Sequence, residues 1–289
     1  MSASGEPVGG EREAAEQRQR AVEFTRLLPA GPPADAREIA AGLDFAARAQ
    51  ARADDARERP YLLLNMISTV DGRASIGGRS GPIGNRADRE LFHALRARVD
   101  AVMAGAGTVR VERYGRIVSS EQTRRERVQR GLSAEPIAGI VSGRLALPHD
   151  TPLLCEPEAR VVVLTPSAAS LPETGAQIDY VRAGKDGELD LASAMRELRA
   201  RFGVQTLVCE GGPHLNTQLL LAGLVDELFL SLAPKLAGGE DATGEALRIL
   251  AGVAFAEPAE LELIGALEND SHLFLRYGVR AAPSPSVRD

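Results

Sequence analysis

Cysteine is scarce in this chain of 289 residues, which contains only Cys155 and Cys209. The two lie far apart in the sequence and no C-x-x-C pair occurs, which argues against a disulfide framework and against a cysteine-based zinc site. We therefore expect a protein that binds no metal and works in a reducing compartment, the cytoplasm. Cys209 lies within an apolar segment and is expected to be buried and unreactive.

Long apolar runs and an excess of basic residues are also missing. No run reaches the length of a transmembrane helix, and the segment MSASGEPVGGEREAAEQRQR (1–20) lacks the apolar core of a signal peptide. The net charge is −6 and the pI is about 5.5, whereas nucleic-acid-binding proteins usually carry a basic excess. We expect neither a membrane nor a nucleic acid as a partner, although a few local arginines could still bind a phosphate.

Apolar runs alternate with helical patterns through the middle of the chain. Continuous apolar runs, typical of strands covered on both faces, occur at 61–67, 100–105, 137–142, 160–165 and 205–210. Amphipathic helical patterns lie at 86–99, 189–203 and 213–223. This alternation predicts an α/β fold in which helices cover both faces of a mostly parallel sheet.

The end of the chain has a different pattern. Three strand-like segments follow closely on one another, at 226–234, 260–268 and 271–279. Asn269-Asp270 between the last two is a turn signal, so the sheet is expected to finish in an antiparallel hairpin.

The same patterns suggest a division of the chain into three parts. Residues 1–58 are expected to form a partly disordered N-terminal arm, with 1–20 disordered and one weakly amphipathic helix around Ile39 and Phe45 that packs on the main domain or on a partner subunit. Residues 59–280 form the main domain, and 281–289 a disordered tail. The charge run at 119–131 is expected to be a solvated helix or loop rather than a phosphate site.

Two glycine-containing turns follow predicted strands. The first, AGAGTVRVERYG (104–115), has Gly105 and Gly107 but carries Arg110 where a Rossmann fingerprint has its third glycine, so a Rossmann dehydrogenase is disfavoured. The second, CEGGPHLNTQLL (209–220), places Pro213 at the start of a helix. Each is explained equally well by a tight turn or by an anion bound to free N–H groups. Two such turns at the carboxyl ends of parallel strands favour nucleotide binding.

A third segment, NMISTVDGRASIGGRSGPIGNRADRELFHALRARVD (65–100), is dense in Gly, Ser and Arg. Asp71-Gly72 would ordinarily form a turn, but the composition of residues 71–89 suggests a binding loop. Asn85 is expected to cap the following helix, with Asp88 at its third position.

The ordered set of motifs resembles the riboflavin-pathway pyrimidine reductases. It comprises N-x-x-S-x-x-D-G, S-G-x-x-G, A-D-R, L-R-A, D-A-V, G-x-G-T-V, E-G-G-P and L-A-P-x-L-x-G-G, spread over residues 60–279. The resemblance implies a dihydrofolate-reductase-like three-layer α/β/α fold and a homodimer. It also implies an NADPH-dependent enzyme that reduces the ribosyl group of a phosphorylated ribosylaminopyrimidine to ribityl. The zinc-deaminase strings H-x-E and P-C-x-x-C are absent, so we expect a stand-alone reductase.

The resemblance also assigns residues. Those expected to meet NADPH are Ile67, Pro82, Gly105, Gly107, Thr108, Glu112, Thr165, Gly211, Gly212, Pro213, His214 and Leu215. Those expected to meet the substrate are Asn65, Ser80, Arg96 and Glu210. The hydroxyls of Thr165 and Ser167 are expected to meet the 2′-phosphate and so to favour NADPH over NADH. Glu210 and Asp71 are the expected catalytic residues. Glu210 is expected to orient or protonate the substrate, and Asp71 to organise the loop, or simply to cap its own turn.

Several positions depart from the family pattern. Asn65 and Arg73 stand where bifunctional bacterial members usually have lysines, and Pro82 stands where many members have tryptophan. The usual D-D-P after the T-V motif is replaced by Val111-Glu112-Arg113-Tyr114. These departures leave two alternatives open: a reductase of a dihydropterin or another heterocycle on the same scaffold, and a non-catalytic NADPH-binding protein.

Overall fold

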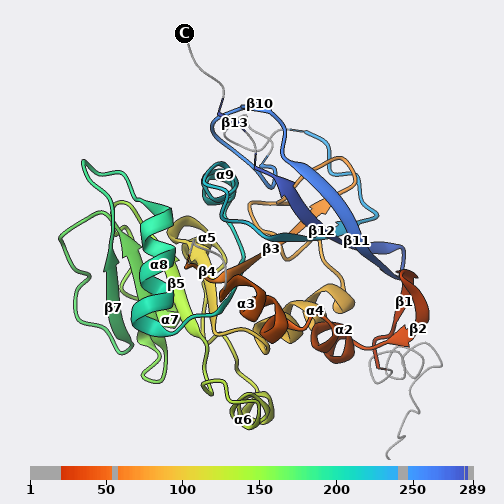
Figure 1. The fold of residues 1–289 in the computed structure, drawn as a ribbon, viewed down its shortest axis with the longest axis horizontal. Coiled ribbons are helices and arrows are strands. Elements are labelled where there is room, and N and C mark those ends of the chain that lie inside the picture. Colours follow the sequence, from red (N-terminus) through yellow and green to blue (C-terminus); the bar gives the residue numbers. More distant parts are fainter. Residues whose placement is uncertain (1–20, 54–57, 240–246, 283, 286–289) are drawn as a thin grey trace, which may run out of the picture.

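The computed structural model describes residues 21–53, 58–239, 247–282 and 284–285 (Figure 1). Its strands are β1 Phe24–Leu28, β2 Ala30–Ala34, β3 Tyr61–Thr69, β4 Ala101–Gly105, β5 Ile137–Val141, β6 Arg160–Thr165, β7 Gln177–Arg182, β8 Thr206–Cys209, β9 Glu227–Ala233, β10 Phe255–Glu257, β11 Glu260–Asn269, β12 His272–Ala281 and β13 Ser284–Pro285. Its helices are α2 Ala36–Gly42, α3 Phe45–Ala53, α4 Arg86–Arg96, α5 Ala106–Val111, α6 Glu121–Gln129, α7 Pro152–Cys155, α8 Leu191–Phe202 and α9 Pro213–Leu221.

One large sheet organises the molecule. Its strand order is β2-β1-β11-β12-β9-β3-β8-β4-β5-β6-β7, so β2 and β7 are its two edges (Figure 1). The strands from β9 to β7 run parallel to one another, and β12, β11, β1 and β2 continue the sheet antiparallel. The predicted mostly parallel sheet with an antiparallel end is confirmed.

Helices cover both faces of this sheet. On one face, apolar side chains of α2, α4 and α5 pack with the sheet in one buried cluster that includes Ile39, Leu91 and Val109. On the other face, α8 and α9 bury Leu198 and Leu219 against the alternate side chains of the same strands. Burial on both faces explains why these strands are continuous apolar runs. The predicted three-layer α/β/α arrangement is confirmed.

Local signals fix the ends of the helices as expected. Asn85 caps α4 by accepting a hydrogen bond from the Asp88 N–H at 2.9 Å. Asp190 caps α8, and Gly203 ends it in the left-handed conformation with φ of 69°. The hairpin turn lies one residue later than predicted: Asp270 and Ser271 connect β11 to β12, both with positive φ, as a two-residue hairpin loop requires.

The segment before residue 59 contains more structure than one helix. β1 pairs with β11, β2 pairs with β1, and a residue with positive φ, Asp44, separates α2 from α3. The prediction of a single helix around Ile39 and Phe45 is therefore wrong, because two short helices and a two-stranded sheet extension occupy this segment. The expected disorder of 1–20 and 286–289 lies outside the described residues. Within the expected tail, Ser284–Pro285 pairs with β10.

Two further observations concern long helices and the charge run. Among the described residues, no helix is long and apolar enough to cross a membrane. The charge run at 119–131 forms α6, but it is not wholly solvated, because the Arg127 side chain is fully buried.

Candidate active site

The two glycine turns meet at the carboxyl edge of the parallel sheet. β4 and β8 are neighbours, and their ends are joined by hydrogen bonds from Gly105 N–H to the Gly211 carbonyl at 2.6 Å and from Glu210 N–H to the Met103 carbonyl at 2.8 Å. A Cβ added at Gly105 would lie 3.4 Å from the Gly212 nitrogen. Glycine therefore allows the two main chains to approach closely.

A groove opens over these turns in two adjoining cavities. The larger, about 530 Å³, is lined by the two glycine turns, the start of α9, Arg110 and Ser142-Gly143. The smaller, about 350 Å³, is lined by the end of β3, one face of α4 and residues 112–115. Both include Met66, Ala74, Ser80, Thr108, Glu112 and Glu210. The shared residues make the cavities two parts of one groove, at the edge where open α/β sheets bind ligands.

The start of α9 fits a pyrophosphate. Gly212 is the N-cap, has no side chain to cap the helix, and is followed by Pro213 at the first position. The N–H groups of His214 and Leu215 belong to the first turn, which has no intrahelical partners and lies at the positive end of the helix dipole. A Cβ at Gly212 would lie 2.8 Å from the Thr108 hydroxyl. One wall of the groove thus contains a helix start without a side-chain cap, at a position where a Cβ would crowd the Thr108 hydroxyl.

A buried ion pair occupies the floor of the smaller cavity. Arg96, the last residue of α4, binds Glu210 in bidentate fashion, with Nε–Oε1 and Nη2–Oε2 distances of 2.7 Å each. Tyr114 donates its hydroxyl to the same Oε2 at 2.6 Å. The Arg96 guanidinium also stacks on the Phe92 ring, 4.0 Å from its centroid. Two charges, a phenol and an aromatic ring thus form one fixed unit.

This unit has strong electrostatic coupling. Burial alone would lower the pKa of Arg96, but the charge and hydrogen bond of Glu210 raise it above its ordinary value. Burial, followed by the charge of Glu210, raises the pKa of Tyr114 well above its usual range. Both groups therefore keep their protons, and both oxygens of Glu210 act as acceptors, the role of an ionised carboxylate. Of the two roles expected for Glu210, this geometry supports orientation rather than proton donation.

Ser80 and Glu112 are bound to each other across the groove. Glu112 Oε1 accepts hydrogen bonds from the N–H and the hydroxyl of Ser80, at 2.8 and 2.9 Å. Both residues line both cavities, so the pair lies where the two cavities join. Ser80 and Glu112 were expected to meet different ligands, whereas the structure makes them one hydrogen-bonded element of the wall.

Asp71 lies beside the groove rather than in its lining. Its carboxylate accepts the Thr69 hydroxyl at 2.5 Å, the Gly238 N–H at 2.7 Å and the Ala237 N–H at 3.1 Å. The Thr69 hydroxyl, and after it the Gly238 N–H, lower the pKa of Asp71 to about 2. Asp71 thereby ties the D-G-R segment to the loop after β9, which supports its expected role in organising the loop and gives no support to a catalytic role.

Three expected cofactor residues do not line the groove: Gly211, which is buried, Thr165 and Pro82. Thr165 is fully buried, and its hydroxyl accepts the Ser167 N–H at 3.1 Å, so it is not available to a 2′-phosphate. Pro82 is exposed outside both cavities, and its carbonyl accepts a hydrogen bond from Lys235. The placement predicted for Thr165 is wrong because the hydroxyl at the end of β6 turns into the main chain that follows it.

The other expected residues line one or both of the two cavities. Asn65 and Ile67 line the smaller cavity, and Gly107, His214 and Leu215 line the larger one. The described residues contain no group of three or more His, Cys, Asp or Glu side chains arranged to hold a metal ion. Cys209 is buried as predicted, and burial raises the pKa of its thiol to about 12.

Sequence reasoning missed three side chains of the smaller cavity. Tyr114 is the hydroxyl partner of Glu210, and Arg89 and Arg113 bring two more guanidiniums to the lining. Neither of these two arginines makes a side-chain hydrogen bond or ion pair within the described part of the chain. The only sequence signal for Tyr114 and Arg113 was that they lie in the segment that replaces the family's D-D-P string. That departure from the family pattern did not show that the two side chains line the cavity.

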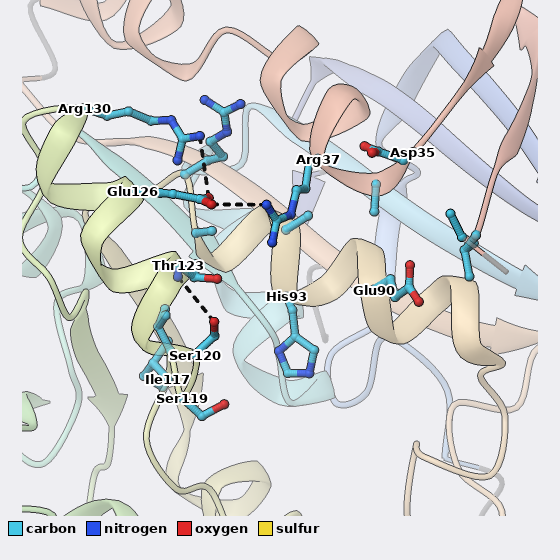
Figure 2. Close-up of a pocket in the computed structure, with 17 residues that line it drawn as sticks. Asp35, Arg37, Glu90, His93, Ile117, Ser119, Ser120, Thr123, Glu126 and Arg130 are labelled. Atoms are coloured by element: carbon cyan, nitrogen blue, oxygen red, sulfur yellow. Dashed lines mark hydrogen bonds and ion pairs between the residues drawn. The ribbon is translucent and has the colours of Figure 1, made fainter. Parts of the chain in front are cut away.

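A separate cavity of about 420 Å³ lies away from the glycine turns (Figure 2). It is walled by α2, α4, α6 and the residues before α6, and it shares no lining residue with the groove. In Figure 2, Glu126 of α6 lies between Arg37 and Arg130, with nitrogen–oxygen distances of 3.2 and 3.9 Å. Its carboxylate is thus engaged with arginines.

Solved structures similar to this one show the fold. A pyrimidine reductase-like protein from Corynebacterium diphtheriae superimposes with a TM-score of 0.65 at 24% identity, covering 88% of this chain and 99% of that one. The riboflavin biosynthesis reductase Rib7 of Saccharomyces cerevisiae does so with a TM-score of 0.56 at 17% identity, covering 81% and 97%. The fold is that of the dihydrofolate-reductase-like pyrimidine reductases.

The sequence places the chain in a family. Residues 60–259 match the RibD C-terminal domain, and the chain belongs to this family. The 2,5-diamino-6-ribosylamino-4(3H)-pyrimidinone 5′-phosphate reductase of Methanothermobacter thermautotrophicus is 30% identical over 188 residues, 64% of this chain and 82% of that protein. The protein of the same name from Archaeoglobus fulgidus is 29% identical over 208 residues, 71% and 93%. Such relatives are pyrimidine reductases of riboflavin biosynthesis.

Proposed function

We propose that this protein is an NADPH-dependent reductase that converts the ribosyl group of a ribosylaminopyrimidine 5′-phosphate into a ribityl group. One observation carries the proposal: the uncapped start of α9 and the Arg96–Glu210–Tyr114 unit lie in adjoining parts of one groove. A pyrophosphate held at the first would place the rest of a dinucleotide beside the second. Family membership of the chain supports the same reaction.

The cofactor side is assigned to the larger cavity. His214 and Leu215 N–H groups would hold the pyrophosphate, with Gly105, Gly107 and Gly212 keeping the approach open. The nicotinamide supplies the hydride, and the protein supplies position and electrostatics. Arg110 also lines this cavity, bound to the Ala146 carbonyl at 2.7 Å, and takes the 2′-phosphate role that was expected of Thr165.

The substrate side is assigned to the smaller cavity. Arg89 and Arg113 present guanidiniums with no side-chain partner in the described part of the chain, and guanidinium is well suited to a phosphate ester. Asn65, on β3, lines the same cavity, and its amide can pair with the polar edge of a pyrimidine. Asp88 also lines this cavity, and burial raises the pKa of its carboxyl. It is the carboxyl in this cavity best suited to carry a proton.

A turnover assay tests the proposal. The purified protein is mixed with NADPH and, separately, with the diamino ribosylaminopyrimidine phosphate, its deaminated counterpart, or a dihydropterin, and the loss of nicotinamide absorbance is followed. Oxidation of NADPH with either ribosylaminopyrimidine is the expected result. Turnover of the dihydropterin alone would assign the scaffold to a different reductase. NADPH binding without turnover of any of the three would point to a binding protein.

A further inference from the structure

One arginine of the charge run is buried while its neighbours are solvated. Arg127 of α6 has 0% exposure and is the largest fully buried side chain among the described residues. Arg125, two residues earlier on the same helix, has a side chain 73% exposed that faces Glu121. Burial lowers the pKa of Arg127 to about 10, which reflects the cost of holding a cation away from water. A charge buried at such cost calls for specific partners.

Those partners are main-chain carbonyls, two at and just beyond the end of α4 and one after α6. Arg127 Nη1 donates to the carbonyls of Arg96 at 3.0 Å and Val99 at 2.9 Å, and its Nε donates to Ser133 at 2.9 Å. Arg96 is the last residue of α4, where carbonyls lack intrahelical partners and the helix dipole is negative. Arg127 therefore holds the main chain of the residue whose guanidinium binds Glu210.

A second buried side chain holds the loop beside that guanidinium. Glu135 Oε1 accepts the N–H groups of Ile117 at 2.8 Å and Val118 at 3.2 Å. The Ile117 carbonyl in turn accepts Arg96 Nη1 at 3.4 Å. Arg96 is thus fixed at its main chain by Arg127, and at its guanidinium by a loop that Glu135 secures.

Neither Arg127 nor Glu135 lines either cavity of the groove. Figure 2 shows the separate cavity, in which Ile117, Ser119, Ser120 and Thr123 lie on the α6 side, across from His93 on α4. Contact with a ligand in the groove is therefore excluded for both residues, and any effect on the reaction must act through Arg96.

We propose that Arg127 and Glu135 are positioning residues of the reductase, a brace that sets the Arg96–Glu210–Tyr114 unit in the substrate side of the groove. The proposal rests on the proposed function. Its physical basis is that the guanidinium of Arg96 has fixed donor directions, so a displaced α4 end would break the bidentate geometry with Glu210. A displacement of about 1 Å can lower a rate on the order of 100-fold.

The test compares Arg127→Met and Arg127→Lys with Arg125→Met as the matched control on the exposed face of α6. For Arg127→Met we expect kcat/KM for the pyrimidine to fall about 10- to 100-fold and the Kd of NADPH to stay unchanged. Arg127→Lys should recover part of the loss, because an ammonium can still donate to the α4 carbonyls. Arg125→Met should match the wild type.

A spectroscopic readout separates this proposal from the reaction itself. The chain has four tyrosines, so ¹³C-tyrosine NMR resolves few signals, and Tyr114→Phe identifies the one bound to Glu210. Arg127→Met should shift the Tyr114 signal and leave the others in place, whether or not any pyrimidine is turned over. Should Arg127→Met fail to fold, Glu135→Gln is measured in the same way, with a shift of the Tyr114 signal expected. A folded variant with a lowered melting temperature, an unmoved Tyr114 signal and wild-type kinetics would overturn the proposal.

Discussion

Glu210 illustrates, at the scale of the residue, how the neighbours of a side chain decide its role. Its position after a strand and before a glycine turn predicts a carboxylate in the site, and the structure places it there. The bidentate contact with Arg96 and the Tyr114 hydroxyl occupy both oxygens. Sequence reasoning cannot assign this, because Arg96 and Glu210 are 114 residues apart. Sequence reasoning also fails for Arg127. Its charge predicts exposure to solvent, and the carbonyl partners that allow its burial are visible only in the structure.

We predict that Glu210→Gln destabilises the protein as well as inactivating it. Removing one charge of a buried pair leaves Arg96 uncompensated, which costs about 3–5 kcal/mol. The double variant Arg96→Met/Glu210→Leu should recover part of this stability but no activity. Urea unfolding and steady-state kinetics of the wild type and these two variants decide the matter. Glu210→Gln with unchanged stability would show instead that the carboxylate is not paired in solution.

We predict that Asp71→Asn lowers the melting temperature only where Asp71 is ionised. The folded pKa of about 2 lies below the ordinary value of 3.8, so the carboxylate contributes stability above that value and loses it as the pH falls toward 2. The difference in melting temperature between wild type and variant should therefore be full at pH 6 and shrink as the pH falls through this window. Asp150→Asn, in an exposed loop, is the control. A difference independent of pH would contradict the assigned contacts.

At the scale of the element, the strands show which kinds of strand can be predicted from the sequence and which cannot. β3, β4, β5, β6 and β8 were predicted because both of their faces are buried, which makes the apolar run continuous. β7 was missed because it is an edge strand with mostly half-exposed side chains. β2, with the sequence AGPPA, was missed because prolines argue against a strand, and it is the opposite edge, where a missing N–H is tolerated.

The start of α9 is the proposed pyrophosphate site, and a single substitution there tests this assignment. We predict that Gly212→Asp abolishes NADPH binding, since a carboxylate would lie where the helix start should meet pyrophosphate. The circular dichroism spectrum should stay that of the wild type. Gly42→Asp, at the end of α2 with open space around it, adds the same charge away from the groove and should bind NADPH normally. Unchanged affinity in folded Gly212→Asp would remove this turn from the cofactor site.

At the scale of the whole molecule, the largest difference between the predicted and the observed structure lies in the first described residues. The segment expected to be an arm contributes two strands to the main sheet, and Phe24 is fully buried against the Phe274 ring, 5.0 Å between centroids. Weak periodicity could not show this, because β1 gains its partner, β11, from the opposite end of the chain. The homodimer implied by the family remains a prediction.

We predict that Phe24→Ala destabilises the entire molecule. Truncating a buried phenylalanine costs about 3–5 kcal/mol, and chemical denaturation should show this loss in one transition shared with the rest of the sheet. Leu27→Ala on the same strand, where Leu27 is 49% exposed, should cost far less. A separate early transition for Phe24→Ala, with the main transition unmoved, would show that the segment is an independent arm.

The most direct test of the reductase assignment follows the hydride itself. NADPH carrying deuterium at C4 of the nicotinamide is incubated with the protein and each ribosylaminopyrimidine phosphate, and the products are examined by mass spectrometry and NMR. We predict a ribityl product with one deuterium at C1′, formed in proportion to the NADPH consumed. Recovery of unchanged ribosyl compound, or deuterium only in the pyrimidine ring, would contradict it.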